Sequence, residues 1–174
     1  MMKGTSLFIK NQRGAAAAEM ALILPLVLVL LFSTFEGAYY IMCEHRVVKG
    51  VRDAARYAGR LDFSNYSCPS SPSNGNTVAE GEFEGDEPPI QNLARTGQLV
   101  DGTPVLPRWD ENSSVTIEVS CRYEQEGLYS VTEGVAPQVR VSADVEYPAL
   151  FSTLGLGTTD WRLKASAESP VMGL

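Results

Sequence analysis

The feature that most constrains the fold of this chain is an uncharged run from Met20 to Phe35, which continues an alanine-rich stretch that begins at Ala15. As an α-helix, residues 15–35 would be about 31 Å long at roughly 1.5 Å per residue, which is enough to cross the hydrocarbon core of a bilayer. The run therefore predicts a membrane-spanning helix. Pro25 lies inside it, and the backbone hydrogen bond that proline removes predicts a kink there.

Three basic residues, Lys3, Lys10 and Arg13, precede the apolar run without any acidic residue. This distribution predicts a cytoplasmic N-terminus, with the residues after about Glu36 outside the membrane. A basic start followed by an apolar core is also typical of a cleaved secretory signal. That alternative fits less well, because the run is long for such a core and residues 33–38 lack small residues at the cleavage spacing. We expect the helix to stay attached to the chain.

Glu19 is the single acidic residue before Glu36, and it lies at the edge of the apolar run. A carboxylate at the edge of a membrane helix is costly unless it finds a partner. Gly14, five residues upstream, offers a small and flexible site for a peptidase. This pattern suggests an assembly signal. The alternative is that Glu19 is an ordinary helix-end residue, which reaches the lipid headgroups beside Arg13.

These residues resemble a known family. Gly14, the four small residues 15–18, Glu19 and an apolar helix that contains Leu24-Pro25-Leu26 are similar to the class III signal of type IV pilins. In particular, they resemble the TadE-like minor pilins and pseudopilins of tight-adherence pili (Tad, Flp or type IVc). The alanine-rich, arginine-bearing stretch at residues 47–59 is also similar to the helix that follows the membrane segment in this family.

The resemblance implies that a prepilin peptidase cuts between Gly14 and Ala15, so that the mature chain begins at Ala15. It also implies that Glu19, the fifth mature residue, pairs with the N-terminal amine of a neighbouring subunit. Such a pair relieves the desolvation of two charges at once. Many relatives carry Tyr or Phe after this glutamate, whereas this chain has Met20.

The function that the resemblance implies is assembly of a Tad-type adhesion pilus, from a single-pass position in the bacterial inner membrane or within the extracellular pilus. The implied partners are the prepilin peptidase, the major pilin, other minor pilins, the inner-membrane pilus platform and membrane lipid. An unprocessed, membrane-tethered periplasmic adaptor or binding protein is the alternative. A surface adhesin is a third class, for which the sequence offers no concentrated ligand site.

Beyond the apolar run the helical pattern continues, because Val47, Val51, Ala54, Ala58 and Leu61 fall on one helix face. We expect one helix that ends near Gly59 and either packs on the chain's own sheet or meets a partner helix. The expected organisation has three parts: a basic cytoplasmic leader (1–14), a transmembrane and stalk helix (15–61) and a periplasmic or extracellular head (62–174).

The sequence pattern of the C-terminal part predicts β-strands. Apolar and polar residues alternate over residues 115–122, 139–147 and 161–168, and one polar face favours antiparallel pairing. With the long helix as the cover of the apolar face, the predicted fold class is α+β: a long N-terminal helix followed by a small antiparallel β-sheet head.

Residues 61–100 lack the alternating pattern of the predicted strands. Residues 67–76 have turn chemistry, and residues 88–97 predict a short helix with proline in its first turn and Gly97 at its end. The acidic run 80–87 predicts a solvated loop, since it lacks the spacing of an EF-hand calcium loop.

Three cysteines are present. Cys68 and Cys121 are both expected outside the membrane in an oxidising compartment, so a disulfide between them is the favoured pairing. Closing about 54 residues would stabilise the head by roughly 4 kcal/mol in the chain-entropy model. Cys43 lies on the helix near the outer membrane interface, where it is expected to be unpaired or buried against a neighbour; an intermolecular bridge is the alternative.

Charge and composition argue against several other classes. The first 14 residues carry three of the 14 Lys and Arg residues, so the remaining 160 residues carry a formal charge of −10, which argues against nucleic-acid binding. His45 is the sole histidine, so neither a catalytic triad nor a histidine metal site is expected. Residues 62–66 approach the metal motif of von Willebrand A domains, but Tyr66 breaks it. We expect no enzyme activity, no metal and no cofactor.

Overall fold

The structure is a computed structural model, and it describes residues 13–71, 77–111, 114–123, 134–152 and 161–173. The chain divides into two compact units, residues 1–39 and residues 40–174. We call the second one the C-terminal unit. Helix α1 (Arg13–Ala58) begins in the first unit and ends in the second. An antiparallel sheet of five strands follows it, so the predicted α+β fold class, with a long N-terminal helix, is confirmed.

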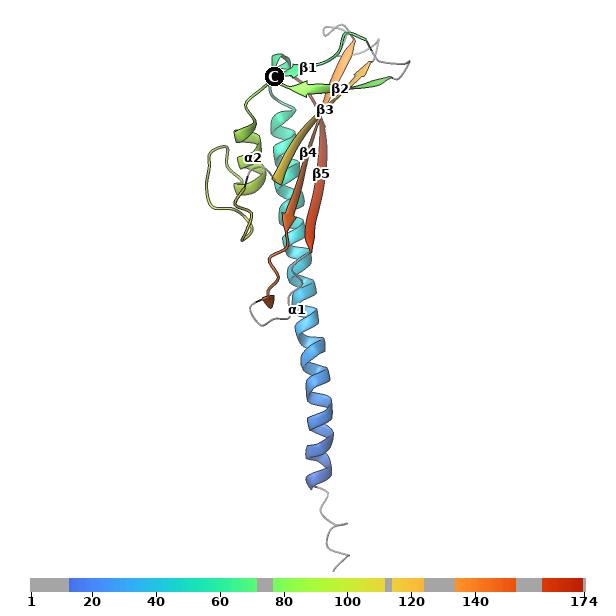
Figure 1. Cartoon of the computed structure of the whole chain (residues 1–174), viewed down its shortest axis with the longest axis vertical. Coiled ribbons are helices and arrows are strands. Elements are labelled where there is room, and N and C mark those ends of the chain that lie inside the picture. The colour runs from blue at the N-terminus through green and yellow to red at the C-terminus, as the bar shows by residue number, and fades with distance from the viewer. Residues whose placement is uncertain (1–12, 72–76, 112–113, 124–133, 153–160, 174) are drawn as a thin grey trace, which may run out of the picture. The chain divides into compact units, whose positions relative to one another are not determined.

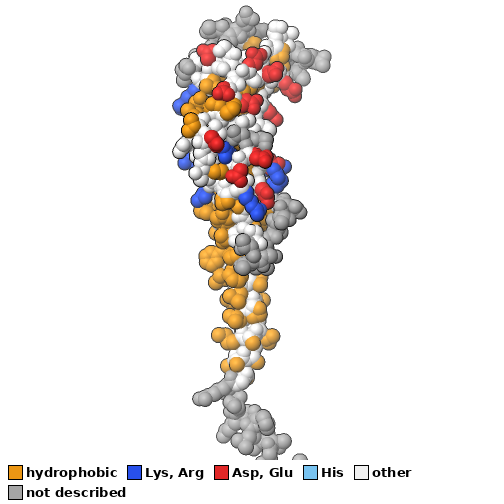
Figure 2. Space-filling view, turned by 60° about the vertical axis from the view of Figure 1, so that its left-hand side comes forward, with side chains coloured by type: hydrophobic (Ala, Val, Ile, Leu, Met, Phe, Trp, Pro, Cys, Tyr) orange, Lys and Arg blue, Asp and Glu red, His pale blue; other side chains and the backbone are white. Residues whose placement is uncertain are grey.

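The N-terminal part of α1 exposes its apolar side chains. Every residue from Gly14 to Leu31 is exposed, and Figure 2 shows hydrophobic side chains following one another along this part of the helix. The helix is long and apolar enough to cross a membrane. Pro25 lies inside it, and the kink predicted there stays a prediction.

The sheet is a meander in which each strand pairs with the next one along the chain (Figure 1). Its strands are β1 (Tyr66–Ser67), β2 (Val78–Phe83), β3 (Val115–Tyr123), β4 (Val135–Glu146) and β5 (Arg162–Pro170), and all four pairings are antiparallel. A 3-10 turn, η1 (Phe63–Asn65), precedes β1. The three alternating stretches of the sequence therefore form the three longest strands.

Strand β2 was not expected, because residues 80–87 were predicted to form a solvated acidic loop. That prediction was wrong for residues 80–83. Two glutamates and a glycine give this segment a low strand propensity, but its backbone pairs with β3, with Gly81 opposite Val119. Glu80 and Glu82 point to the exposed side while Ala79, Gly81 and Phe83 are partly covered. Tertiary pairing has thus overridden local propensity.

The core of the C-terminal unit lies between the sheet and the last turns of α1, which run along one face of the strands (Figure 1). Alternate residues of β4 (Val139, Val141, Ala143 and Val145) are at most 4% exposed. Four residues of the predicted apolar face of α1 are completely buried: Val47, Val51, Ala54 and Ala58. The fifth, Leu61, lies beyond the end of the helix and is only partly buried. Cys43 and Ala55 of α1 are also buried. Trp109 and Leu106, from the connection between α2 and β3, complete the core.

The end of α1 is tied to the sheet by Tyr66. Its hydroxyl donates to the carbonyl oxygen of Ala58, the last residue of the helix. No N–H group within the helix donates to this oxygen, which also accepts from the N–H of Leu61 at 3.0 Å. Burial raises the pKa of Tyr66 to about 12. The helix end is thereby fixed beside β1.

Helix α2 (Glu87–Thr96) has the caps that the sequence predicts. Two prolines occupy its first turn, and Gly97 follows its end with φ at 76°, a left-handed conformation that suits glycine. Ile90 and Ala94 are completely buried. At Ala94, α2 passes so close to Gly50 of α1 that a Cβ atom on Gly50 would lie 2.1 Å from the Ala94 carbonyl oxygen.

Replacing Gly50 with alanine is therefore expected to destabilise the C-terminal unit by roughly 1–3 kcal/mol, because backbone atoms must move apart to admit the methyl group. Thermal unfolding in detergent, followed by circular dichroism, measures this change. Gly37 is the matched control, since it lies in the same helix and has no atom within 4 Å of its added Cβ. Gly37→Ala should be neutral or stabilising by up to about 1 kcal/mol. Equal stabilities of the two variants would contradict a tight crossing of α1 and α2.

Candidate assembly segment

The predicted processing site lies in the first turn of α1, since the helix begins at Arg13 and the Gly14–Ala15 peptide bond follows directly. The first four N–H groups of a helix have no acceptor within it, so the first turn opens at a lower cost than a turn in the middle of the helix. A Cβ atom on Gly14 would meet no atom within 4 Å. The site is therefore sterically open. Lys3 and Lys10 of the predicted leader lie outside the described residues.

Glu19 lies one turn further on, and its side chain is exposed. Among the described residues it makes no hydrogen bond or ion pair. Two glutamates on the sheet differ in this respect: Glu146 accepts a hydrogen bond from Arg108 at 2.8 Å, and Glu168 is paired with Arg140. Glu19 is followed by an uncharged run from Met20 to Phe35. A carboxylate without a described partner in this position is available to a cation from outside the chain.

Cys68 and Cys121 form a disulfide, with their Cα atoms 5.8 Å apart. This is the pairing predicted from the sequence. Cys68 follows the edge strand β1 and Cys121 lies on β3, so the bond passes over β2 between them. Gly81 of β2 makes room for it, because a Cβ atom there would lie 2.5 Å from the Cys121 sulfur. Cys43 is a buried thiol on α1.

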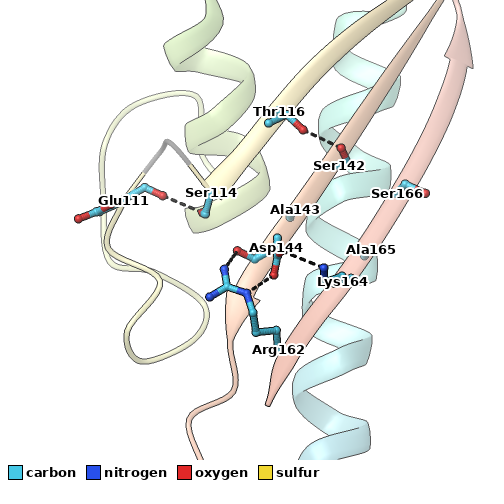
Figure 3. A pocket seen from close by; sticks show the side chains of 10 residues that line it. All are labelled: Glu111, Ser114, Thr116, Ser142, Ala143, Asp144, Arg162, Lys164, Ala165 and Ser166. Atoms are coloured by element: carbon cyan, nitrogen blue, oxygen red, sulfur yellow. Dashed lines mark hydrogen bonds and ion pairs between the residues drawn. The ribbon is translucent and has the colours of Figure 1, made fainter. Parts of the chain in front are cut away.

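The outer face of the sheet carries an open, polar depression (Figure 3). Asp144 lies at its centre, and its carboxylate accepts a hydrogen bond from Arg162 Nε at 2.5 Å. The ammonium nitrogen of Lys164 lies 3.2 Å from the second carboxylate oxygen of Asp144. Partial burial would raise the pKa of Asp144, but the hydrogen bonds and charges of Arg162 and Lys164 outweigh it and hold that pKa below its ordinary value. Because these charges satisfy one another, the depression is a solvated sheet face rather than a strong ligand site.

The other residues singled out in the sequence have structural positions. The Asp62 carboxylate accepts from the backbone N–H of Ser64 at 2.9 Å, which caps η1 and lowers the pKa of Asp62. His45 is an exposed residue of α1. Within the described residues, no three His, Cys, Asp or Glu side chains lie close enough together to hold a metal ion.

An aromatic cluster was not anticipated from the sequence. Tyr40 of α1 lies 5.1 Å from Tyr147 and 6.0 Å from Trp161, measured between ring centroids, and both contacts are edge-to-face. Tyr147 and Trp161 were predicted only as positions in strands. Aromatic residues close to the end of an apolar helix are the signal that could have drawn attention to Tyr40.

The fold and this segment define a class of protein: a chain with one apolar N-terminal helix able to span a membrane, which continues into an α+β unit. Residues 14–56 match the family described as TadE-like protein. The resemblance seen in the sequence is confirmed over this stretch, which begins at Gly14 and ends within the last turn of α1. The matched stretch covers 43 of the 174 residues, and it shows what this segment of the chain is similar to. No curated protein and no solved structure matches the chain.

Proposed function

We propose that this chain is a minor pilin or pseudopilin, which a prepilin peptidase matures by cutting between Gly14 and Ala15. The observation that carries the proposal is the family match, whose first residue is Gly14 and which includes Glu19. The exposure of every residue from Gly14 to Leu31 supports it. An apolar helix surface of that length requires lipid or other helices around it.

In the proposed mechanism, cleavage creates a free amine on Ala15. Glu19 of a neighbouring subunit pairs with this amine, because both charges are costly to leave unpaired near a low-dielectric environment. The small residues 15–18 allow neighbouring helices to approach closely at this level. The apolar surfaces of the helices then bundle.

The proposed topology follows the distribution of charge. We assign residues 1–14 to the cytoplasmic leader, residues 15–61 to the transmembrane and stalk segment, and residues 62–174 to the periplasmic head. The helix of the stalk segment ends at Ala58. The oxidising periplasm is consistent with the Cys68–Cys121 disulfide. The proposed partners are the prepilin peptidase, the major pilin, other minor pilins, the inner-membrane pilus platform and membrane lipid.

The N-terminal residue of the membrane-extracted protein tests this proposal. We expect Ala15 at the N-terminus when the chain is produced together with the prepilin peptidase, as measured by intact mass and N-terminal sequencing. A Gly14→Ile variant is the matched control, because its bulkier side chain should block the cut and leave the leader attached. A retained leader in the unmodified chain would instead support a membrane-tethered adaptor. A start beyond Phe35 would identify a secretory signal.

A further inference from the structure

The aromatic cluster of Tyr40, Tyr147 and Trp161 joins α1 to the end of β4 and the start of β5. Tyr147 follows β4 and is 2% exposed, and its backbone N–H donates to the Trp161 carbonyl oxygen at 2.8 Å. Tyr40 packs against both rings in edge-to-face contacts. The position of the indole is thus fixed on two sides by rigid aromatic neighbours.

Trp161 nevertheless leaves 52% of its surface exposed, whereas Trp109 is 1% exposed and donates its indole N–H to Ser114 at 2.7 Å. Three further large apolar side chains of the C-terminal unit are exposed in chain segments next to the cluster: Ile41 (54%), Met42 (43%) and Leu150 (47%). Leaving half of a fixed indole ring in contact with water is unfavourable, because most of its surface is apolar.

The position of Tyr40 along α1 indicates what surrounds Trp161. Tyr40 follows Phe35, the last residue of the uncharged run, by five residues, which is about 7.5 Å of helix rise. The headgroup layer extends roughly 5–7.5 Å beyond the hydrocarbon core on each side of a bilayer. The backbone of Tyr40 therefore falls at the outer edge of the lipid headgroups, a region in which tryptophan and tyrosine are enriched because they present both an apolar ring and a polar group.

We propose that Trp161 is a membrane-interface anchor, whose indole inserts among the lipid headgroups of the leaflet that faces the C-terminal unit. Tyr40 and Tyr147 hold the ring in place. This contact sets the depth at which the C-terminal unit rests on the membrane. The proposal depends on the membrane position of α1 in the proposed function, and its test separates the two.

The full-length chain is reconstituted into vesicles of phosphatidylcholine and phosphatidylglycerol, and flotation with the vesicles is measured first. Its two tryptophans are then separated by variants. Trp109→Phe leaves Trp161 as the only reporter, and Trp161→Phe leaves the buried Trp109 as the matched control. If Trp109→Phe fails to fold, the difference between the unmodified chain and Trp161→Phe gives the Trp161 signal. The quenchers are phosphatidylcholine brominated near the carboxyl end or near the methyl end of its acyl chain, and aqueous iodide.

We expect bromines near the carboxyl end to quench Trp161 at least about twofold more than bromines near the methyl end, as for other interfacial tryptophans. Trp109 should respond to neither lipid. Failure of the chain to float would overturn the membrane position itself. A chain that floats while iodide quenches Trp161 and the lipids do not would overturn the anchor alone. Protection of Trp161 from all three quenchers would show that protein covers the ring, which also overturns the anchor.

Discussion

Replacing Glu19 with alanine is expected to remove this chain from assembled pili while leaving its processing and fold unchanged. Breaking a charge pair in a low-dielectric environment costs about 3–5 kcal/mol, because the amine left behind is uncompensated. That cost corresponds to at least a hundredfold loss of affinity for each subunit contact. The measurement is the amount of the chain in sheared pili relative to the amount in the membrane, by immunoblot.

Two variants make this prediction specific. Glu19→Asp keeps the charge and should retain part of the incorporation. Glu44→Ala removes an exposed carboxylate of the same helix within the C-terminal unit, and it should incorporate normally. Normal incorporation of Glu19→Ala, with Ala15 as its N-terminus, would show that Glu19 is an ordinary helix-end residue.

Loss of the disulfide is expected to have the largest effect on stability. The bond closes a loop with a sequence separation of 53 residues, which corresponds to about 4 kcal/mol in the chain-entropy model. Cys68→Ser should lower the free energy of unfolding by roughly 2–5 kcal/mol. Thermal unfolding of the purified chain in detergent measures this, with Trp109 fluorescence as a probe of the core.

Reducing agent provides the control for this second prediction. It should destabilise the unmodified chain and a Cys43→Ala variant alike, since both contain the bond. Cys68→Ser should not respond to it. A response by Cys68→Ser, or none by the unmodified chain, would show that the Cys68–Cys121 bond does not stabilise the fold.

Local patterns in the sequence were sufficient for much of the fold. The apolar run and the face from Val47 to Ala58 gave the long helix, because helical periodicity is visible within a few turns. Proline at the start and Gly97 at the end gave α2. Strict alternation gave the three longest strands, since each exposes one polar face.

Residues whose state depends on distant partners were not predictable in this way. Strand β2 contains Glu80, Gly81 and Glu82, which locally favour a loop, and only its register against β3 makes it a strand. Leu106 and Trp109 lie in a connection without periodicity, yet both are buried. The neighbouring Val105 donates its N–H to the carbonyl oxygen of Arg95 on α2 and accepts from Arg46 of α1, and no short stretch of sequence specifies such contacts.

The sequence by itself determined the segment on which the proposed assembly depends. Gly14, Glu19 and the apolar run are close neighbours in the chain, and their chemistry follows from a helix of bilayer length. Only the tertiary structure decided which distant residues of the sheet and of α1 come into contact. Tyr40 and Trp161 are separated by more than one hundred residues, and their contact exists because the end of the β4–β5 hairpin returns to α1. Contacts of that kind depend on pairing and packing, which are set by the folded chain as a whole.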